Sequence, residues 1–238
     1  GRRGTAADVK ETVLAAKRAG INNISVDLML GIPGQTPETL KTSMDLALSL
    51  GVTHLSVYIL KIEPGTVFFK RKEKLELPDD DTVADLYLLT REYLTSRGMR
   101  HYEISNFCFG NAVGRHNFSY WQCGEYLGVG PAAHSFINGR RFYYERDLAG
   151  FLAGNPPVYD GPGGDAQEAL MLPLRTDTGL ELKRYETAFG LTLSAGFYDE
   201  IKEYEALGLL TLQAGSLRLT GKGFLLSNTI FSALLAEL

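Results

Sequence analysis

The sequence predicts an α/β fold followed by a small helical unit that contains one β-hairpin. Amphipathic helices alternate with β-branched strands over residues 5–60, at the spacing of parallel strands joined by crossover helices in a doubly wound sheet or a (β/α) barrel. A stretch rich in glycine and proline, residues 154–164, has the composition of a linker. Beyond it, helices surround one hairpin, an order that resembles a winged-helix unit. We therefore expect two domains, residues 1–153 and 154–238.

The amino-terminal part should contain two helices that alternate with two strands. The first helix covers residues 5–19, where apolar residues recur at helical spacing, and a strand over residues 23–30 follows it. Thr36 is a good N-cap for the second helix, and Gly51 stands where a helix commonly ends. The next strand, residues 54–60, is rich in β-branched and aromatic residues and is expected to be buried.

A third helix, another strand and a long irregular segment should follow. Three aspartates at residues 79–81 favour a helix N-terminus, and this helix is expected to end near Arg97. Residues 99–105 have the composition of a strand, whereas residues 106–141 show little periodicity and indicate loops over a site. Two parallel strands cannot bury both faces of a sheet, so we expect partner strands from preceding residues or from another chain.

The carboxy-terminal domain is expected to combine helices with a hairpin. The turn at Ala214 and Gly215 separates two short apolar strands. The expected helices cover residues near 165–173, 181–188 and 196–207 and the residues from Gly221 onward, and the expected strands cover residues 209–213 and 217–219.

Composition and charge exclude several classes of protein. Hydrophobic residues make up 45% and charged residues 22% of the chain, as in folded soluble domains. No apolar run approaches the roughly 20 residues that cross a bilayer, so we expect no integral membrane segment and a cytoplasmic location. The net charge of −4 is mild and the basic residues are scattered. Acidic residues also outnumber the one lysine in the helix expected at residues 196–207, so no nucleic-acid partner is expected.

The chain has two cysteines, Cys108 and Cys123. They are too few for a disulfide framework, a structural zinc site or an iron–sulfur cluster. Both have aromatic neighbours in the sequence, so we expect them to be small buried hydrophobes and not low-pKa nucleophiles. The sequence therefore assigns no catalytic residue.

The first candidate site is the strand over residues 23–30 and the glycine-rich turn after it. In an α/β fold this turn lies at the carboxyl edge of the sheet, where ligands bind, and Asp27 on a buried strand could accept hydrogen bonds from ribose hydroxyls. An ordinary turn with a buried, hydrogen-bonded Asp27 explains the same residues, and spacing alone favours that alternative.

The second candidate site is the aromatic segment at residues 115–135, which holds two of the four histidines and the only tryptophan. A neutral imidazole such as that of His116 can bind heme iron, and tyrosine or tryptophan can stack on a macrocycle and donate to its propionates. In the alternative, His116 caps a turn while Trp121 and Tyr126 close the end of a barrel. Arg115 could equally pair with a carboxylate. The residues alone leave these alternatives open.

Several short segments, each weak alone, occur in an order and spacing that are specific. Together they resemble the oxygen-independent coproporphyrinogen III oxidase-like radical SAM proteins, and the His-Asn-x-x-Tyr-Trp element points to their heme-chaperone (HemW-like) branch. The resemblance covers nearly the whole chain. The segments are residues 27–28, 31–36, 54–58, 62–66, 102–107, 116–121, 126–130 and 219–228.

The resemblance implies the carboxy-terminal part of a partial (β/α)6 barrel of the TIM-like radical SAM type. It also implies S-adenosylmethionine and a 4Fe-4S cluster held by a Cys-x-x-x-Cys-x-x-Cys motif, which this sequence lacks. Residues 23–30 and 54–60 resemble the fifth and sixth barrel strands, so four strands and the cluster loop would precede Gly1. We expect this chain alone to be inactive as a radical enzyme and to form homo-oligomers through an exposed barrel edge.

The resemblance assigns three residues to S-adenosylmethionine. Asp27 matches a position at the ribose, Leu60 would lie near the adenine, and Arg2 matches an arginine near the amino-acid end of the cofactor. The family often has a histidine two places after that arginine, where this chain has Gly4.

The resemblance also assigns a heme element. His116 matches the motif associated with heme and is the candidate ligand of heme iron, and Asn117, Tyr120 and Trp121 are candidate contacts to the ring or its propionates.

Three functions are compatible with these features. The first is a heme chaperone that binds heme and delivers it to acceptor proteins. The second is an oxygen-independent coproporphyrinogen III oxidase, a radical decarboxylase of porphyrin biosynthesis that shares the barrel. The third treats the winged-helix-like unit as a docking or nucleic-acid-binding module. The His-Asn-x-x-Tyr-Trp element favours the first.

Overall fold

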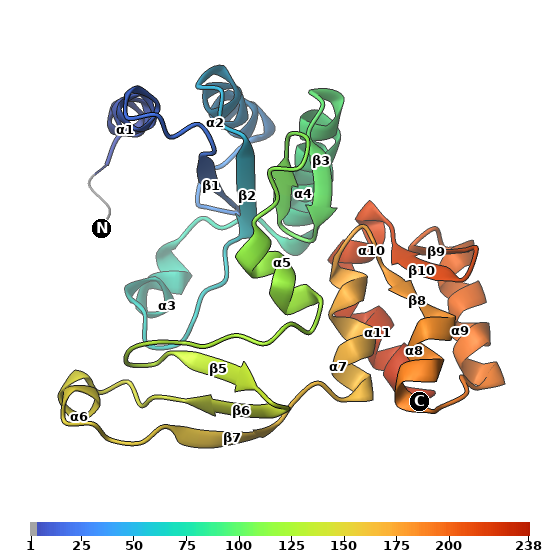
Figure 1. Ribbon diagram of the computed structural model, residues 1–238. Helices are drawn as coiled ribbons and strands as arrows, with labels where there is room; N and C mark the ends of the chain where they lie inside the picture. The colour runs from blue at the N-terminus through green and yellow to red at the C-terminus, as the bar shows by residue number, and fades with distance from the viewer. Residues whose placement is uncertain (1–3) are drawn as a thin grey trace. The chain divides into compact units, whose positions relative to one another are not determined.

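The computed structural model describes residues 4–238, so Arg2 lies outside the described residues. The chain forms two compact units, the first ending at Val113 and the second covering Gly114–Leu238 (Figure 1). The domain boundary predicted after residue 153 lies within the second unit and stays a prediction.

The first unit contains the predicted alternation of helices and strands. Helix α1 (Ala6–Arg18) precedes strand β1 (Ser25–Leu30), and helix α2 (Pro37–Ser49) precedes strand β2 (His54–Ile59). The two strands are parallel. The predicted order and the parallel pairing are therefore confirmed.

The helix ends in this unit follow from capping side chains. The Thr36 hydroxyl accepts the Thr39 N–H at 3.3 Å, and the Thr39 hydroxyl oxygen accepts the Thr36 N–H at 2.9 Å. Gly51 follows the C-cap of α2 with a φ of 63°, a left-handed conformation that favours glycine. Helix α4 (Asp80–Ser96) begins after Asp79, whose carboxylate accepts the Thr82 N–H at 2.8 Å. Hydrogen bonding from the Thr82 side chain, and then from its N–H, lowers the pKa of Asp79.

The strand predicted at residues 99–105 is confirmed, but the strand that follows it was not predicted. The chain forms strand β3 (Arg100–Glu103), turns, and returns as strand β4 (Asn106–Cys108), which pairs antiparallel with both β3 and β2. The Glu103 carboxylate accepts the Ser105 N–H at 2.9 Å and stabilises this tight turn. The sheet order is β1-β2-β4-β3, so a partner of β2 comes from the described chain itself.

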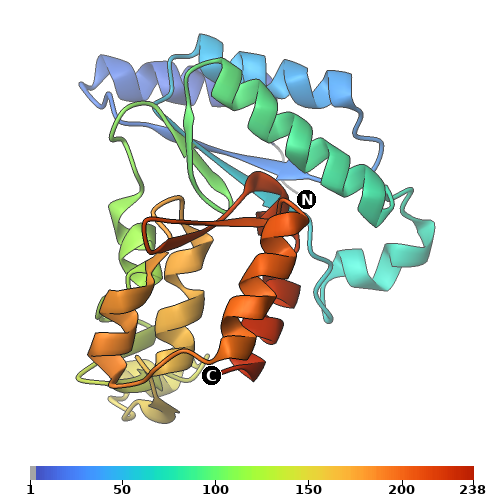
Figure 2. The ribbon, with the colours of Figure 1, turned by 90° about the vertical axis from the view of Figure 1, so that its right-hand side faces the viewer.

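Helices α2 and α4 cover one face of this sheet (Figure 2). The side chains between the helices and the sheet are almost fully inaccessible to solvent, and each contributes about 1.5–3 kcal/mol of hydrophobic free energy. They include Leu30, Leu40, Met44, Leu55, Val57, Leu86 and Leu94.

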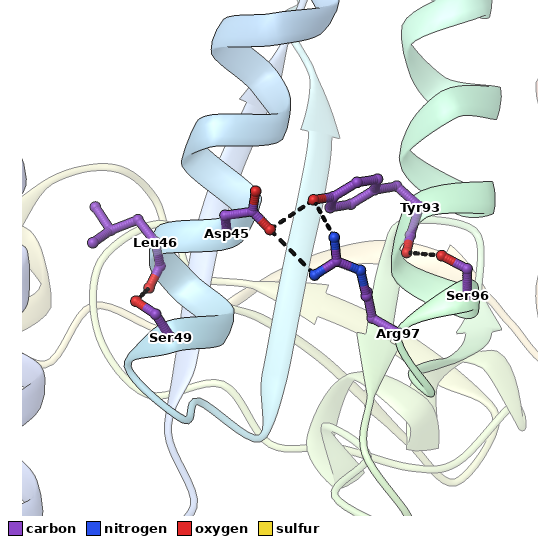
Figure 3. Close-up of polar contacts among 6 residues, drawn as sticks. All are labelled: Asp45, Leu46, Ser49, Tyr93, Ser96 and Arg97. Carbon is purple, nitrogen blue, oxygen red and sulfur yellow. Dashed lines mark hydrogen bonds and ion pairs between the residues drawn. The ribbon is translucent and has the colours of Figure 1, made fainter.

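A polar contact joins the outer surfaces of α2 and α4 (Figure 3). The Tyr93 hydroxyl donates to the Asp45 carboxylate at 2.6 Å, and Arg97 donates to the Tyr93 hydroxyl oxygen at 2.7 Å. The Arg97 guanidinium also lies 4.6 Å from the centre of the Tyr93 ring. Because this cluster is exposed, it contributes little to the free energy of unfolding. Its main effect is on the alignment of the two helices.

A loop after β2 carries helix α3 (Val67–Arg71) and a single 3-10 turn, η1 (Lys72–Lys74). Neither was predicted. Both are too short for a recognisable apolar stripe.

The second unit begins with helix α5 (Arg115–Trp121) and an antiparallel sheet of strands β5 (His134–Ile137), β6 (Arg140–Tyr143) and β7 (Val158–Pro162), with helix α6 (Leu148–Leu152) before β7. The predictions of loops over residues 106–141 and of a linker over residues 154–164 were wrong where these strands form. The strands are only four or five residues long, so their alternation is weak.

The carboxy-terminal part of the second unit confirms the predicted helices and hairpin. Strands β9 (Leu210–Gln213) and β10 (Ser216–Leu219) form the hairpin, and strand β8 (Leu180–Glu181), which was not predicted, pairs with β10. Its helices are α7 (Ala166–Met171), the 3-10 turn η2 (Pro173–Arg175), α8 (Leu182–Phe189), α9 (Ala195–Ala206), α10 (Gly221–Leu225) and α11 (Ser227–Ala236). Their shared core includes Leu170, Leu174, Phe197, Ile201, Leu217 and Ile230.

We predict that Leu94→Ala lowers the free energy of unfolding by about 2–5 kcal/mol, because the removed atoms leave a cavity under α4. Leu94 has no exposed surface. Urea unfolding followed by circular dichroism measures the change. Tyr93→Phe, which alters only the neighbouring exposed cluster, is the control and should change much less. Equal losses for the two variants would contradict this account of the core.

Candidate functional site

One candidate site lies on the face of the first sheet that α2 and α4 leave uncovered. Residues alternate across a strand, and the register pairs Ser25 with His54 and Asp27 with Ser56, so these four side chains share a face. Asp27 is exposed, and its expected burial was therefore wrong. Its carboxylate is an accessible hydrogen-bond acceptor in the middle of this polar face.

His54 is held by two hydrogen bonds on the same face. Its Nδ1 lies 2.8 Å from the Ser25 hydroxyl, and its Nε2 lies 2.8 Å from the Tyr102 hydroxyl. Burial lowers the pKa of His54, although the nearby Asp27 carboxylate acts in the opposite direction. His54 is therefore neutral near pH 7 and serves as a hydrogen-bonded link between β1 and β3.

Leu60 lies directly after β2, is half-buried, and donates its N–H to the Leu30 carbonyl at 2.8 Å. The turn after β1 is fixed by Gln35, which accepts the Gly31 N–H at 2.8 Å and donates to the Met29 carbonyl at 2.9 Å. Asp27 thus lies on β1, and Leu60 lies just beyond the end of the adjacent parallel strand β2. Gln35 lies in one of the segments that carry the family resemblance, but the sequence did not predict that its side chain stabilises this turn.

The second candidate site is built around α5. Residues four apart lie on one face of a helix, and the His116 Nε2 is 2.6 Å from the Tyr120 hydroxyl. Their rings meet edge to face with centres 4.9 Å apart. His116 is therefore inside a helix, and the alternative in which it caps a turn was wrong. Asn117, one residue further along the helix, is exposed.

Trp121 faces the carboxy-terminal helices of the same unit. The Arg175 guanidinium lies 5.6 Å from the centre of the Trp121 ring and 5.1 Å from that of Phe231. Such cation–π contacts contribute about 0.5–1 kcal/mol each at partly exposed sites. Trp121 consequently anchors α5 to the helical part of the unit.

A pocket of about 360 Å³ lies beside Tyr120. Three aromatic side chains form much of its lining: Tyr120 meets Tyr126 edge to face at 4.5 Å between ring centres, and Tyr126 lies 6.4 Å from Phe136. The remaining lining residues are Cys123, Gly124, His134, Arg141, Glu168 and Leu172. Of the four heme residues predicted from the sequence, Tyr120 lines this pocket, whereas His116, Asn117 and Trp121 do not.

An ion pair joins two sides of the pocket. Arg141 on β6 donates to both carboxylate oxygens of Glu168 on α7, with one nitrogen–oxygen distance of 2.8 Å. The Gly164 N–H donates to the same carboxylate at 2.7 Å. The Arg141 hydrogen bond lowers the pKa of Glu168, which is therefore ionised near pH 7. These residues are 27 positions apart, and no local sequence signal could have found the pair.

The two cysteines differ in their surroundings. Cys108 is fully buried on β4, as predicted. Cys123 is only half-buried and lines the pocket. Burial raises the pKa of the Cys123 thiol, so it is protonated near neutral pH and is a poor nucleophile.

Residues 4–238 contain neither a candidate membrane-spanning helix nor a group of metal-binding side chains. No helix in this part of the chain is both long and apolar enough to cross a membrane. In the same residues, no three side chains of histidine, cysteine, aspartate or glutamate are grouped so that they could hold a metal ion.

Comparisons with known proteins identify relatives of the chain. Residues 165–226 match the model of the HemN C-terminal domain. The chain is 34% identical over 241 residues to the heme chaperone HemW of Bacillus subtilis, covering 97% of this chain and 64% of that protein. It is 32% identical over 259 residues to the mitochondrial radical S-adenosyl methionine domain-containing protein 1 of Bos taurus, covering 59% of that protein.

The fold resembles one solved structure closely. Coproporphyrinogen III oxidase (HemN) from Escherichia coli, described as a radical SAM enzyme, superposes with a TM-score of 0.75, covering 98% of this chain and 59% of the other at 20% sequence identity. At that identity the likeness shows the fold alone, a mixed α/β fold. The chain spans 64% of the length of the Bacillus subtilis protein and 59% of the length of the Bos taurus protein.

We predict that lowering the pH destabilises the first unit partly through His54. Its pKa is lower in the folded than in the unfolded chain, so its contribution to stability is complete above about pH 6.5 and is lost as the pH falls towards the folded pKa. Urea unfolding at about pH 7.5 and about pH 5.5 should show a smaller acid-induced loss for His54→Gln than for the wild-type chain. Identical losses would show that His54 titrates normally.

We also predict that Glu168→Gln lowers the free energy of unfolding by about 1–3 kcal/mol, because it leaves the partly buried Arg141 without its charged partner. Thermal or urea unfolding measures this loss. Glu203→Gln, at an exposed position on α9, is the matched control and should leave stability nearly unchanged. A neutral result at residue 168 would mean that the ion pair does not stabilise the pocket.

Proposed function

Because the chain belongs to the HemN-like radical SAM family that contains the HemW heme chaperones, we propose that the protein binds heme and delivers it to acceptor proteins. The observation that carries this proposal is the aromatic pocket beside α5. Tyr120 of the His-Asn-x-x-Tyr-Trp element lines this pocket, whose volume of about 360 Å³ suits part of a macrocycle.

The residues of this pocket fit a heme group. The faces of Tyr120, Tyr126 and Phe136 offer apolar contact to a flat ring. We propose that His116, Asn117, Tyr120 and Trp121 contact heme, with His116 as a ligand of its iron. If the His116 Nε2 held the heme iron, its 2.6 Å hydrogen bond to Tyr120 would have to open, and the Tyr120 hydroxyl would then be able to donate to a propionate.

S-adenosylmethionine is proposed to bind on the polar face of the first sheet. Asp27 presents an exposed carboxylate for the ribose hydroxyls, and Leu60 offers an apolar contact for the adenine. Arg2 is proposed at the amino-acid end of the cofactor. In proteins of this family, S-adenosylmethionine and a 4Fe-4S cluster supply reductive radical chemistry, and the cluster motif is absent from this sequence.

The finer architecture is part of the same proposal. We propose that the first sheet belongs to a partial (β/α)6 barrel and that residues 154–238 form a winged-helix-like domain. Strand β1 lies at the edge of its sheet, and Met29 on it is 46% exposed, which supports the proposed homo-oligomer. A cytoplasmic location is proposed for the whole protein.

Two other functions have weaker support. An oxygen-independent coproporphyrinogen III oxidase shares the fold, and anaerobic formation of protoporphyrinogen by the full-length protein would establish it. A nucleic-acid-binding module would need a basic surface. Helix α9 instead carries Asp199, Glu200, Glu203 and Glu205 against Lys202.

We predict that His116→Ala weakens hemin binding about tenfold or more and changes the Soret band of the bound heme. Titration of the purified chain with hemin, followed by absorption spectroscopy, measures both quantities. Asn22→Ala, an exposed change in the first unit, is the control and should leave the titration unchanged. An unaltered Soret band in the His116 variant would remove His116 as a ligand.

A further inference from the structure

The structure points to a second histidine at the aromatic pocket. His134 starts strand β5, and its register partner on β6 is Tyr143. The two rings stack with centres 5.0 Å apart and planes 25° apart. Because side chains alternate along a strand, His134 shares its face of the sheet with Phe136, and both residues line the pocket.

The His134 ring is also oriented by a carboxylate. Its Nδ1 lies 3.9 Å from an oxygen of Asp160 on β7, beyond hydrogen-bond distance but close enough for an electrostatic contact. With the proton on Nδ1, the ring would leave the Nε2 lone pair available. Histidines that bind metal ions commonly have a carboxylate beside the ring nitrogen that does not bind, because it fixes the tautomer and makes the imidazole a stronger donor.

The other three histidines are not among the residues that line this pocket. Both ring nitrogens of His54 have hydroxyl partners, and His101 is buried against Phe107, with ring centres 4.2 Å apart. The His116 Nε2 is occupied by the Tyr120 hydroxyl. The Nε2 of His134 has no hydrogen-bond partner among residues 4–238, and 59% of the His134 side chain is exposed.

The remaining lining suits a flat apolar ligand and not a small ion. Tyr120, Tyr126 and Phe136 present ring surfaces, and the protonated Cys123 thiol adds no charge. Arg141 and Glu168 neutralise one another. A bare divalent cation would meet one imidazole and no free carboxylate in this lining, whereas heme needs only one or two axial ligands.

We propose that His134 is an axial ligand of heme iron in this pocket, oriented by Asp160 and Tyr143. The inference rests on the proposed heme-binding function and adds a ligand to it. His116 does not line this pocket, so the role proposed for His134 does not depend on ligation by His116. Removal of the Asp160 charge should make the imidazole a weaker donor and shift the reduction potential of the iron upward.

The test is hemin titration of the chain with absorption and electron paramagnetic resonance spectra of the bound form. His134→Ala should raise the Kd about tenfold or more and convert low-spin iron to high-spin iron or remove the bound state. Added imidazole should restore the low-spin spectrum. Asp160→Asn should retain binding and raise the reduction potential. Tyr159→Ala, an exposed residue on the same sheet, is the matched control and should change neither quantity.

The outcomes separate this inference from the proposed function. A wild-type chain with no Soret band on titration would overturn both. A wild-type chain that binds hemin and a His134→Ala variant with the same Kd and spin state would overturn the role of His134 alone. Circular dichroism of each variant distinguishes loss of the ligand from loss of the fold. If His134→Ala proved unfolded, an unchanged reduction potential in folded Asp160→Asn would by itself refute the inference.

Discussion

The second unit depends on the helical periodicity of α5. Successive helical residues are separated by about 100° around the axis, so residues four apart lie together and adjacent residues diverge. His116 and Tyr120 therefore share one face, while Trp121 lies on another and reaches Arg175. One short helix thus presents Tyr120 to the pocket and contacts the carboxy-terminal helices through Trp121. A one-residue insertion between His116 and Tyr120 would turn their side chains about 100° apart and break the contact between them.

The pocket itself is closed by an interaction between distant parts of the chain. Arg141 comes from a strand and Glu168 from a helix, and their bidentate contact joins the three-stranded sheet to α7. The pair is only partly buried, so its ions keep some hydration and avoid most of the desolvation penalty of a fully buried pair. Because its two charges cancel, the pocket gains a rigid wall without acquiring net charge, as an apolar ligand requires.

The sequence predicts the long, strongly periodic elements because their signals are local. Thr36 and Asp79 cap helices through hydrogen bonds to residues three positions away, and Gly51 has the expected left-handed conformation. The short strands of the second unit were missed because four residues give little alternation. A signal did exist at Asn138 and Gly139, whose φ angles of 51° and 70° match a two-residue hairpin turn, for which Asn-Gly is a strong indicator.

The candidate sites were predictable to a smaller extent, since they combine distant residues. His116 and Tyr120 can be paired from their spacing. His134, Asp160 and Glu168 cannot, because strand register and the Arg141 contact bring them to the pocket. The turn between β3 and β4 was missed for a similar reason: the Glu103 carboxylate that stabilises it lies inside a run of strand-forming residues.

The two faces of the first sheet differ in polarity. One face is apolar and is packed under helices, which is sufficient for folding. The other face carries polar side chains on adjacent strands, although buried polar groups are costly unless they have partners. His54 has partners in Ser25 and Tyr102, whereas the Oδ1 of Asn106 is buried without a partner among the described residues. Apolar side chains would stabilise this face more, so its polarity supports the proposal that a polar ligand binds near Asp27.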